Sequence, residues 1–528
     1  MKDCLGLRLD RFELAVLAIL TCVAGSAFVP ILGAGRPLSG AVGLWPEDQL
    51  QYFAWVRESA HHLLIGNPFD IASTARRFLH PAFAISGLVH AATGLSIPLS
   101  FYLWEPVALL LLFIGYRAYV RRLATGQVPR GVALSLTLLA ISPLFVALEL
   151  SGMAPPAVAR AAALYASEVW TAGIFWGYPV TALSLALMPL ALLGVESWRR
   201  TRRPRTLCLT CAASLLMSWI HPWQGAVVVV LILSVEGLRY FQTREPPSPG
   251  LLLVLAASML PAIYYEVLTI LDPVWRTYRA QSAKPRAFLA PVLALLPLAA
   301  PAAVAYRLPA VSWQEQAVRI WPLAALLVYL LPAGTYPIHS LQGVALPLGI
   351  LAVQGAQSLG WKLQSKVVIG LVIGAMLLPG WEYQLRTLRT LTSRGGWYFI
   401  LPGEKRALKA LEHDRRPGGV LATVWPGMVV PSATGRKVYV GHESWSPDFP
   451  KRAWAAGDLF SGRLTGHAAQ EFVRASRARF LLAGCGQRAD LTKALGDLVV
   501  QVRRYDCATV YDLIELSPMG RAAGPPDD

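Results

Sequence analysis

Residues 44–70 read LWPEDQLQYFAWVRESAHHLLIGNPFD and follow the first strongly apolar segment of the chain. Two adjacent acids, Glu47 and Asp48, stand there among aromatic residues, although the chain holds 48 Lys and Arg against 31 Asp and Glu. Pro46 suits the first position of a helix, and acids in the first turn interact favourably with the helix dipole. The stretch therefore predicts a helix that begins beside the acids.

The helix predicted over 46–64 is amphipathic, with a polar and aromatic face and an apolar remainder. Side chains three or four positions apart share a helix face. We expect the apolar remainder, which includes Leu50 and Phe53, to rest in the membrane interface. The acids either only start this helix or also carry chemistry, and their position alone leaves both interpretations open. The shared face consists of Asp48, Tyr52, Trp55, Ser59 and His62.

The composition is that of a membrane protein. The 528 residues are 55% hydrophobic and 15% charged, with a mean hydropathy of +0.47, whereas soluble proteins carry about 25% charged residues. The net charge of +17 is concentrated between apolar segments, which is typical of membrane topology and not of nucleic-acid binding. We therefore expect no nucleic-acid partner.

Segments long enough to cross a bilayer, about 20 apolar residues each, recur about eleven times. Lys and Arg cluster at alternate ends of these segments, which marks the cytoplasmic side. We therefore expect a multi-pass protein of the plasma (inner) membrane, with a cytoplasmic N-terminus, a long outer loop over 34–96 and an extracytoplasmic C-terminal part. The expected spans are 13–33, 97–119, 131–151, 172–195, 206–221, 223–240, 250–270, 288–306, 318–333, 341–358 and 366–381.

One further segment, residues 80–95, is apolar but short for a crossing. Counting it as a span inverts every later loop and places the arginine clusters outside. We therefore interpret it as a partly inserted or surface helix.

The composition changes after the last span and becomes that of a soluble domain. Alternating strand and helix patterns predict a small α/β domain with a mainly parallel sheet, in which KVYVG (437–441) is one strand. Cys485 and Cys507 could pair in an oxidising outer compartment, and the sequence leaves their pairing open. The expected units are 1–390 (transmembrane domain), 391–516 (extracytoplasmic α/β domain) and 517–528 (disordered tail).

Polar residues predicted near the outer membrane surface are further candidates for a functional site. Three histidines fall there, and polar residues at membrane depth usually face a cavity; the alternative is that they cap helix ends. Basic residues on this side either contact anionic lipid headgroups or bind a phosphate through forked guanidinium donors. The candidates are His80, His221, His339, Arg77, Arg276, Arg279 and Tyr336.

The order of these features resembles the GT-C superfamily of membrane glycosyltransferases, which includes the protein O-mannosyltransferases and the lipid A aminoarabinose transferase. The acids of WPEDQLQYF match the acidic motif in the first outer loop of that superfamily, and GNPFD and HPAFAISGLVHAATGLS resemble the region after it. The resemblance extends loosely over residues 1–380. The segment VPSATGRKVYVGHES looks like the outer domains of uncharacterised bacterial members.

The resemblance implies a polytopic α-helical fold and a transferase that moves a sugar from a polyprenyl-phosphate donor to an acceptor hydroxyl on the outer face. Asp48 is then the base, with Glu47 as second choice, and a carboxylate of ordinary pKa acts best by accepting the proton late. The leaving phosphate needs its charge neutralised, and a single displacement inverts the sugar carbon. The residues expected to neutralise it are Arg276, Arg279, His221 and His339.

The chain departs from the family pattern at two points. Many relatives carry an arginine before the tenth span, where this chain has Tyr336, His339 and Gln342. A second acidic pair, which some members use, is not evident, so a divalent metal stays undecided and no cofactor is firmly implied. Two other functions stay open: a transporter or flippase of lipid-linked glycans, and a non-catalytic scaffold for envelope assembly. The expected partners are membrane lipid, a lipid-linked sugar donor and a glycan, lipid or protein acceptor.

Overall fold

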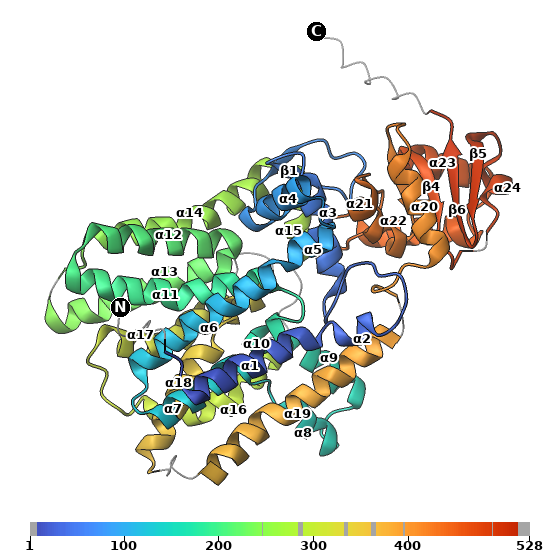
Figure 1. The fold of residues 1–528 in the computed structure, drawn as a ribbon. Helices are drawn as coiled ribbons and strands as arrows, with labels where there is room; N and C mark the ends of the chain where they lie inside the picture. Colours follow the sequence, from blue (N-terminus) through green and yellow to red (C-terminus); the bar gives the residue numbers. More distant parts are fainter. Residues whose placement is uncertain are drawn as a thin grey trace, which may run out of the picture.

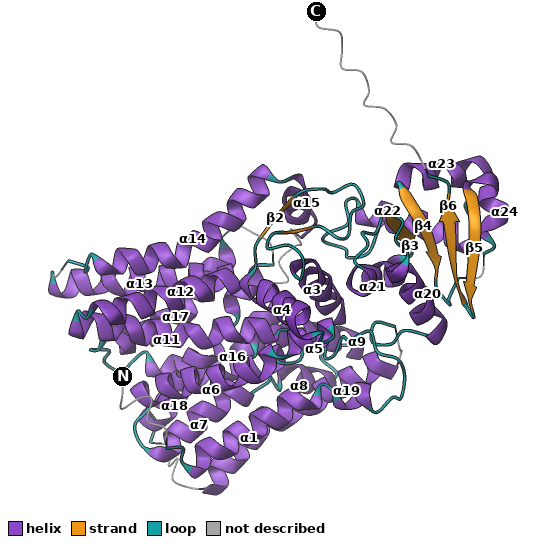
Figure 2. Cartoon of the chain, turned by 45° about the horizontal axis from the view of Figure 1, so that its top comes forward, coloured by secondary structure: helices purple, strands orange, loops and turns teal. Residues whose placement is uncertain are grey.

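A long bundle of helices with a small mixed sheet at one end makes up the computed structural model (Figure 1). Between bundle and sheet lie α3, α4 and α15, which come from distant parts of the chain (Figures 1 and 2). The structure describes residues 8–244, 246–282, 289–331, 336–360, 366–393, 396–487 and 489–515.

The bundle and the elements beside it extend from α1 to α19. Its helices are α1 Arg11–Ser26, α2 Val29–Leu32, α3 Pro46–Ser59, α4 Pro81–Thr93, α5 Ile97–Tyr102, α6 Trp104–Leu123, α7 Gln127–Leu139, α8 Leu144–Leu150, α9 Pro156–Ala166, η1 Ser167–Val169, α10 Thr171–Ile174, α11 Pro179–Thr201, α12 Pro204–Ile220, α13 Pro222–Thr243, α14 Gly250–Leu271, α15 Pro273–Ser282, α16 Leu289–Ala305, α17 Trp313–Leu330, η2 Pro337–Leu341, α18 Ala345–Ser358 and α19 Lys366–Ser393. Two short strands, β1 Ile65–Gly66 and β2 Arg76–Phe78, pair after α3.

Five helical segments among the described residues are long and apolar enough to cross a membrane. A sixth span results if α7 and α8 are counted together despite a bend of 69° between them. These helices are those of a multi-pass membrane protein. The remaining expected spans fall short of the required length or apolarity, or reach outside the described residues, so the number eleven and the orientation of the bundle stay predictions. The five segments are 11–32, 97–123, 179–201, 222–243 and 250–271.

The segment 80–95 forms α4, whose 13 residues extend over about 20 Å at 1.5 Å per residue. The hydrocarbon core of a bilayer is about 30 Å thick. Because α4 is too short to cross it, the interpretation as a surface or partly inserted helix agrees with its length.

Helix α3 begins at Pro46, as predicted, but ends at Ser59, so that His62 lies outside it. The expectation that Leu50 and Phe53 rest in the membrane interface is wrong, because these side chains are 0% and 1% exposed. The ring of Phe53 packs edge-on against aromatic rings of α5. Helix α3 therefore buries its apolar side within the protein.

The C-terminal sheet has the strand order β3-β4-β6-β5. The expectation of a mainly parallel sheet is wrong: β3 and β4 are parallel, but β6 is antiparallel to both of its neighbours. A short hairpin joins β5 and β6, and only antiparallel strands can be joined in that way. The elements of this region are α20 Pro402–His413, β3 Gly419–Ala422, α21 Val424–Thr434, α22 Phe449–Ser461, α23 Gly466–Ser476, β4 Ala478–Ala483, α24 Leu491–Leu495, η3 Gly496–Leu498, β5 Val499–Tyr505 and β6 Ala508–Leu513.

Two local features of this region bear on the sequence predictions: the segment KVYVG and the cysteine pair. The segment KVYVG forms no strand, and only Val438 makes an isolated bridge, to Val420. Cys485 and Cys507 form a disulfide with their Cα atoms 4.7 Å apart, which answers the question that the sequence left open. The boundaries of the expected domains stay predictions, and the expected tail over 517–528 lies outside the described residues.

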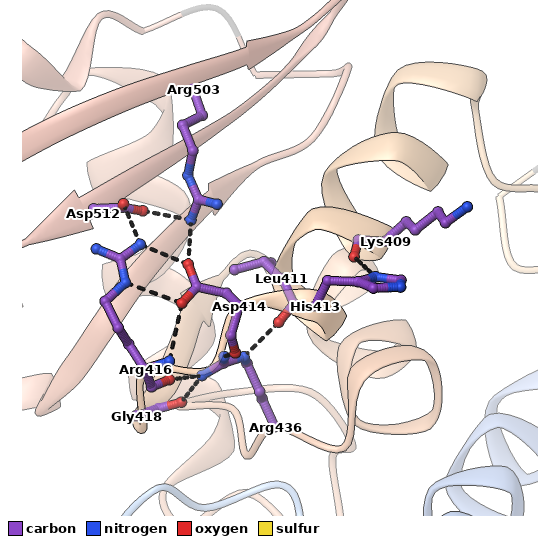
Figure 3. A network of polar contacts seen from close by, with 9 residues as sticks. All are labelled: Lys409, Leu411, His413, Asp414, Arg416, Gly418, Arg436, Arg503 and Asp512. Carbon is purple, nitrogen blue, oxygen red and sulfur yellow. Dashed lines mark hydrogen bonds and ion pairs between the residues drawn. The ribbon is translucent and has the colours of Figure 1, made fainter.

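A network of carboxylates and guanidinium groups holds the segment after α20 against the sheet (Figure 3). Asp512 of β6 is 0% exposed and accepts hydrogen bonds from Arg416 at 2.6 Å and from Arg503 at 2.7 Å. Arg416 also donates to both carboxylate oxygens of Asp414, at 3.0 and 2.6 Å. The buried carboxylate is thus paired, as the burial of a charge requires.

Asp512→Asn should loosen this sheet. The substitution removes the charge that two arginines share and leaves their donors poorly paired, which we expect to cost about 1–3 kcal/mol. In hydrogen–deuterium exchange of the full-length protein, the amides of β4 to β6 should exchange about tenfold faster. Asp497→Asn, at an exposed position in η3, is the control, and equal protection of the sheet in both variants contradicts the assigned role.

Candidate functional site

The Asp48 carboxylate is held at the start of α3 by side chains from distant parts of the chain. Its Oδ2 accepts a hydrogen bond of 2.5 Å from the hydroxyl of Tyr178, and its Oδ1 lies 3.4 Å from Nε2 of His442. Tyr178 directly precedes α11, and His442 lies between α21 and α22. The first loop, the bundle and the C-terminal region therefore meet at this carboxylate.

The hydrogen bonds around His442 define its tautomer. Nδ1 of His442 accepts a hydrogen bond of 3.1 Å from the backbone N–H of Ser444. A neutral imidazole that accepts at Nδ1 carries its proton on Nε2, so Nε2 donates to Asp48. Burial opposes the negative charge of Asp48, but the hydrogen bonds and charge of the surrounding groups outweigh it, and the pKa of Asp48 lies below its ordinary value. Asp48 is therefore a carboxylate at neutral pH.

A cavity of about 360 Å³ lies beside Tyr178 and is called here the aromatic cavity. Tyr178 forms part of its wall, while Asp48 lies behind that wall, on the hydroxyl of Tyr178. Apolar walls with a few convergent polar groups are the usual form of a ligand site. The aromatic rings in the lining are Tyr52, Trp55, Phe78, Phe83, Tyr178, Trp223, Tyr265, Trp275, Tyr278 and Trp445, and its polar or charged members include Gln51, His80, His221, Glu266, Arg279, His339 and Gln342.

Three buried polar atoms of this lining have no hydrogen-bond partner within the part of the chain that the structure describes: Nδ1 of His80, Nδ1 of His221 and Oε1 of Gln342. Buried polar atoms are normally paired, so these three atoms are exceptions to that rule among the residues of the lining. Burial lowers the pKa of His80 to about 4. A hydrogen bond of 3.3 Å between its Nε2 and the carbonyl of Ile220 raises the pKa, but by less than burial lowers it. His80 is therefore neutral at neutral pH.

His339 is held between an acid and a second histidine. Its Nε2 lies 3.3 Å from Oε2 of Glu168, which is 8% exposed, and its ring centroid lies 5.0 Å from that of His221. Glu168 belongs to the short helix η1. Among the described residues, no group of three or more His, Cys, Asp or Glu side chains is arranged to hold a metal ion.

Four of the residues predicted for the site line the aromatic cavity: His80, His221, His339 and Arg279. Arg279 also forms an ion pair of 2.5 Å with Glu266. The three histidines and this arginine come from four separate parts of the chain, so the fold brings together what the sequence could only place on one side of a membrane.

The other predicted residues lie outside the cavity lining. Arg77 and Arg276 donate to the carbonyls of Leu271 and Ile270, at 2.8 and 2.7 Å, and so satisfy the last carbonyls of α14. The Tyr336 hydroxyl lies 3.0 Å from Oγ of Ser444. Glu47, the second choice for the base, is exposed. The contacts of the two arginines are structural.

Sequence reasoning missed the residues that complete the site, above all Tyr178, Glu168 and His442. His442 and Asp48 are 394 positions apart, and no local spacing connects them. The only signal available was the segment VPSATGRKVYVGHES, which was noted for its resemblance but not for its histidine.

An aromatic cluster fastens this segment to the first loop and to α15. The ring of Trp445 stacks on Tyr278 with centroids 4.2 Å apart and meets Trp55 and Trp275 edge-on, each at 5.1 Å. Asn67 donates to the Trp445 carbonyl at 2.7 Å. These contacts place His442, three residues earlier, within reach of Asp48.

The fold is similar to those of solved membrane glycosyltransferases, in agreement with the fold that the sequence resemblance predicted. The oligosaccharyltransferase of Archaeoglobus fulgidus, tethered to an acceptor peptide, is similar with a TM-score of 0.52 and 12% identity, over 90% of this chain and 69% of that one. The same enzyme in complex with an inhibitory peptide and a dolichol-phosphate gives 0.52 and 12%, over 89% and 69%. ArnT of Cupriavidus metallidurans bound to undecaprenyl phosphate gives 0.49 and 13%, over 96% and 98%. No family model and no curated protein matches the sequence.

Trp445→Ala should destabilise the docking of the C-terminal region. Removing a buried tryptophan costs about 3–5 kcal/mol, so thermal unfolding followed by circular dichroism should begin at a clearly lower temperature. Trp454→Ala, on α22 and 71% exposed, is the matched control and should unfold like the wild type. Equal unfolding temperatures for both variants contradict the role given to Trp445.

Proposed function

We propose that this chain is a membrane glycosyltransferase that moves a sugar from a polyprenyl-phosphate donor to an acceptor hydroxyl. The observation that carries the proposal is an ionised Asp48 one hydrogen bond behind the wall of an aromatic cavity. The GT-C fold supports the same class of reaction, and the Archaeoglobus fulgidus structure contains a dolichol-phosphate.

The aromatic cavity suits both halves of such a donor. Aromatic rings provide flat apolar surfaces for the prenyl chain and for the C–H faces of a sugar ring. The polar side chains of His80, His221 and Gln342 in the lining suit sugar hydroxyls. Arg279 and His339 supply the donors for the phosphate, which needs stabilisation as its negative charge develops.

The reaction that we assign is a single displacement. The acceptor oxygen attacks the anomeric carbon, and the bond from that carbon to the phosphate oxygen breaks with its electron pair on the phosphate. The acceptor proton passes to Asp48 late in the step, by way of the Tyr178 hydroxyl that stands between the cavity and the carboxylate. It passes late because a carboxylate of low pKa is a weak base until the acceptor oxygen has become positive. Polyprenyl phosphate leaves, and the configuration of the anomeric carbon inverts.

His442 acts as a positioning residue in this proposal. Its Nε2–H holds Oδ1 of Asp48 while Tyr178 holds Oδ2. Both bonds orient the carboxylate and keep it ionised. The C-terminal region is therefore a part of the catalytic site and not only an attached domain.

Asp48→Asn should abolish transfer while leaving the fold intact. Proteoliposomes would receive radiolabelled undecaprenyl-phosphate hexoses or pentoses and an extract of the native envelope as acceptor, and the release of undecaprenyl phosphate would be measured. Loss of the proton acceptor should lower the rate about 100-fold or more. Glu47→Gln, at the adjacent exposed acid, is the control and should retain most activity.

Full transfer by Asp48→Asn at a normal protein level contradicts the mechanism. Translocation of the lipid-linked sugar without its transfer by the wild type favours a flippase. Absence of transfer by the wild type with every donor favours a non-catalytic scaffold.

His442→Ala should shift the acid limb of the pH–rate profile. The hydrogen bond from His442 lowers the pKa of Asp48, so Asp48 stays ionised to a lower pH; without that bond its pKa rises, and activity is lost at a higher pH. We therefore expect the acid limb of His442→Ala to move toward higher pH. His442→Gln keeps an N–H donor and should lie nearer to the wild type. An unchanged acid limb in His442→Ala contradicts the positioning role.

A further inference from the structure

A second cavity, of about 280 Å³, lies between α6, α11 and α12. It shares no lining residue with the aromatic cavity. Each of the three helices contributes residues three or four positions apart, so one face of each helix forms a wall. The apolar lining consists of Ile114, Ala118, Leu190, Leu193, Leu209 and Ala213.

The apolar rim of this cavity is exposed on the outside of the bundle. Ile114 is 40% exposed and Leu209 is 54% exposed. Helices α6 and α11 belong to segments that are long and apolar enough to cross a membrane. Exposed apolar side chains on such helices face lipid, so the cavity is accessible to a molecule that diffuses within the bilayer.

One end of the cavity is charged. Arg122 forms two hydrogen bonds with Glu196, at 3.0 and 2.5 Å, and this pair closes the cavity there. Arg200 lies at the same end, is exposed, and has no hydrogen bond or ion pair to any described residue. From Ile114 to Arg122, two turns of α6 separate the apolar part from the charged end by about 12 Å.

We propose that this cavity binds one anionic phospholipid of the bilayer, with an acyl chain between the three helices and its phosphate at Arg200. The apolar walls suit a hydrocarbon chain and do not suit a free phosphate or a sugar. The arginine at the end favours an anionic headgroup over a zwitterionic one, because each basic residue near a membrane surface contributes about 1 kcal/mol of attraction. The ligand is bound lipid and is neither donor nor acceptor of a sugar.

Native mass spectrometry of the full-length protein in detergent tests the proposal with phosphatidylglycerol and phosphatidylcholine in equal amounts. The wild type should retain one phosphatidylglycerol in about fivefold preference, which corresponds to one basic contact. Ala213→Trp fills the cavity and should abolish retention. Ala212→Trp, at the neighbouring exposed position outside the lining, should retain the lipid like the wild type.

A second pair of variants tests the headgroup contact without filling the cavity. Arg200→Ala should retain lipid but lose the preference for phosphatidylglycerol, whereas Arg203→Ala, an exposed arginine outside the lining, should keep it. Equal retention of both lipids by the wild type overturns the proposal. Retention of phosphatidylglycerol by Ala213→Trp at the wild-type level also overturns the proposal. Preferential retention of undecaprenyl phosphate over phosphatidylglycerol in the same competition does so too.

Discussion

The hydrogen bond between His442 and Asp48 depends on a close approach of two regions that are far apart in the sequence. At Gly441 a Cβ atom would lie 2.7 Å from the Phe69 ring and 2.8 Å from the carbonyl oxygen of Gly427. Glycine is therefore required where the C-terminal segment passes the first loop. An ion pair of 3.0 Å between Arg452 and Asp70 holds the same two segments together.

These contacts join the C-terminal region to the helical bundle at one place. The bundle supplies Tyr178, His221 and His339, and the first loop supplies the carboxylate. The C-terminal region supplies the imidazole that orients the carboxylate and, through Trp445, a wall of the cavity. None of the three parts forms the site by itself.

The bundle also buries charged side chains away from this site, and there each charge is paired. Glu13 lies 3.0 Å from Arg117 and 2.7 Å from Arg121. Glu236 pairs with Arg199 and accepts a hydrogen bond from Trp313 at 2.8 Å. Charges in apolar surroundings are costly unless they are paired. Each of these buried carboxylates is therefore neutralised by at least one arginine.

The sequence predicted what depends on local patterns. Pro46 and the acids after it marked the start of α3, and the length of the apolar runs marked five of the spanning segments. Four of the predicted site residues line the aromatic cavity because turns on one side of a bundle lie near one another. The partners of Asp48 were missed, since a contact over 394 positions leaves no local pattern. Arg77 and Arg276 contact helix-end carbonyls, which charge alone could not foretell, and their role in phosphate binding stays a prediction.

The sheet illustrates the same limit. Its strands were predicted from their apolar residues, but the pairing direction depends on the connections. The hairpin between β5 and β6 makes that part antiparallel. The segment around Val438 reads as a strand by its residues, yet it makes one bridge only, because α21 precedes it and the first loop packs against it.

A structure of the full-length protein with bound undecaprenyl phosphate tests the central claim most directly. We expect the phosphate in the aromatic cavity, within hydrogen-bond distance of His339 or Arg279, with the oxygen that would carry the sugar pointing toward Asp48. A phosphate bound elsewhere, with the aromatic cavity occupied only by water, would contradict the proposed function.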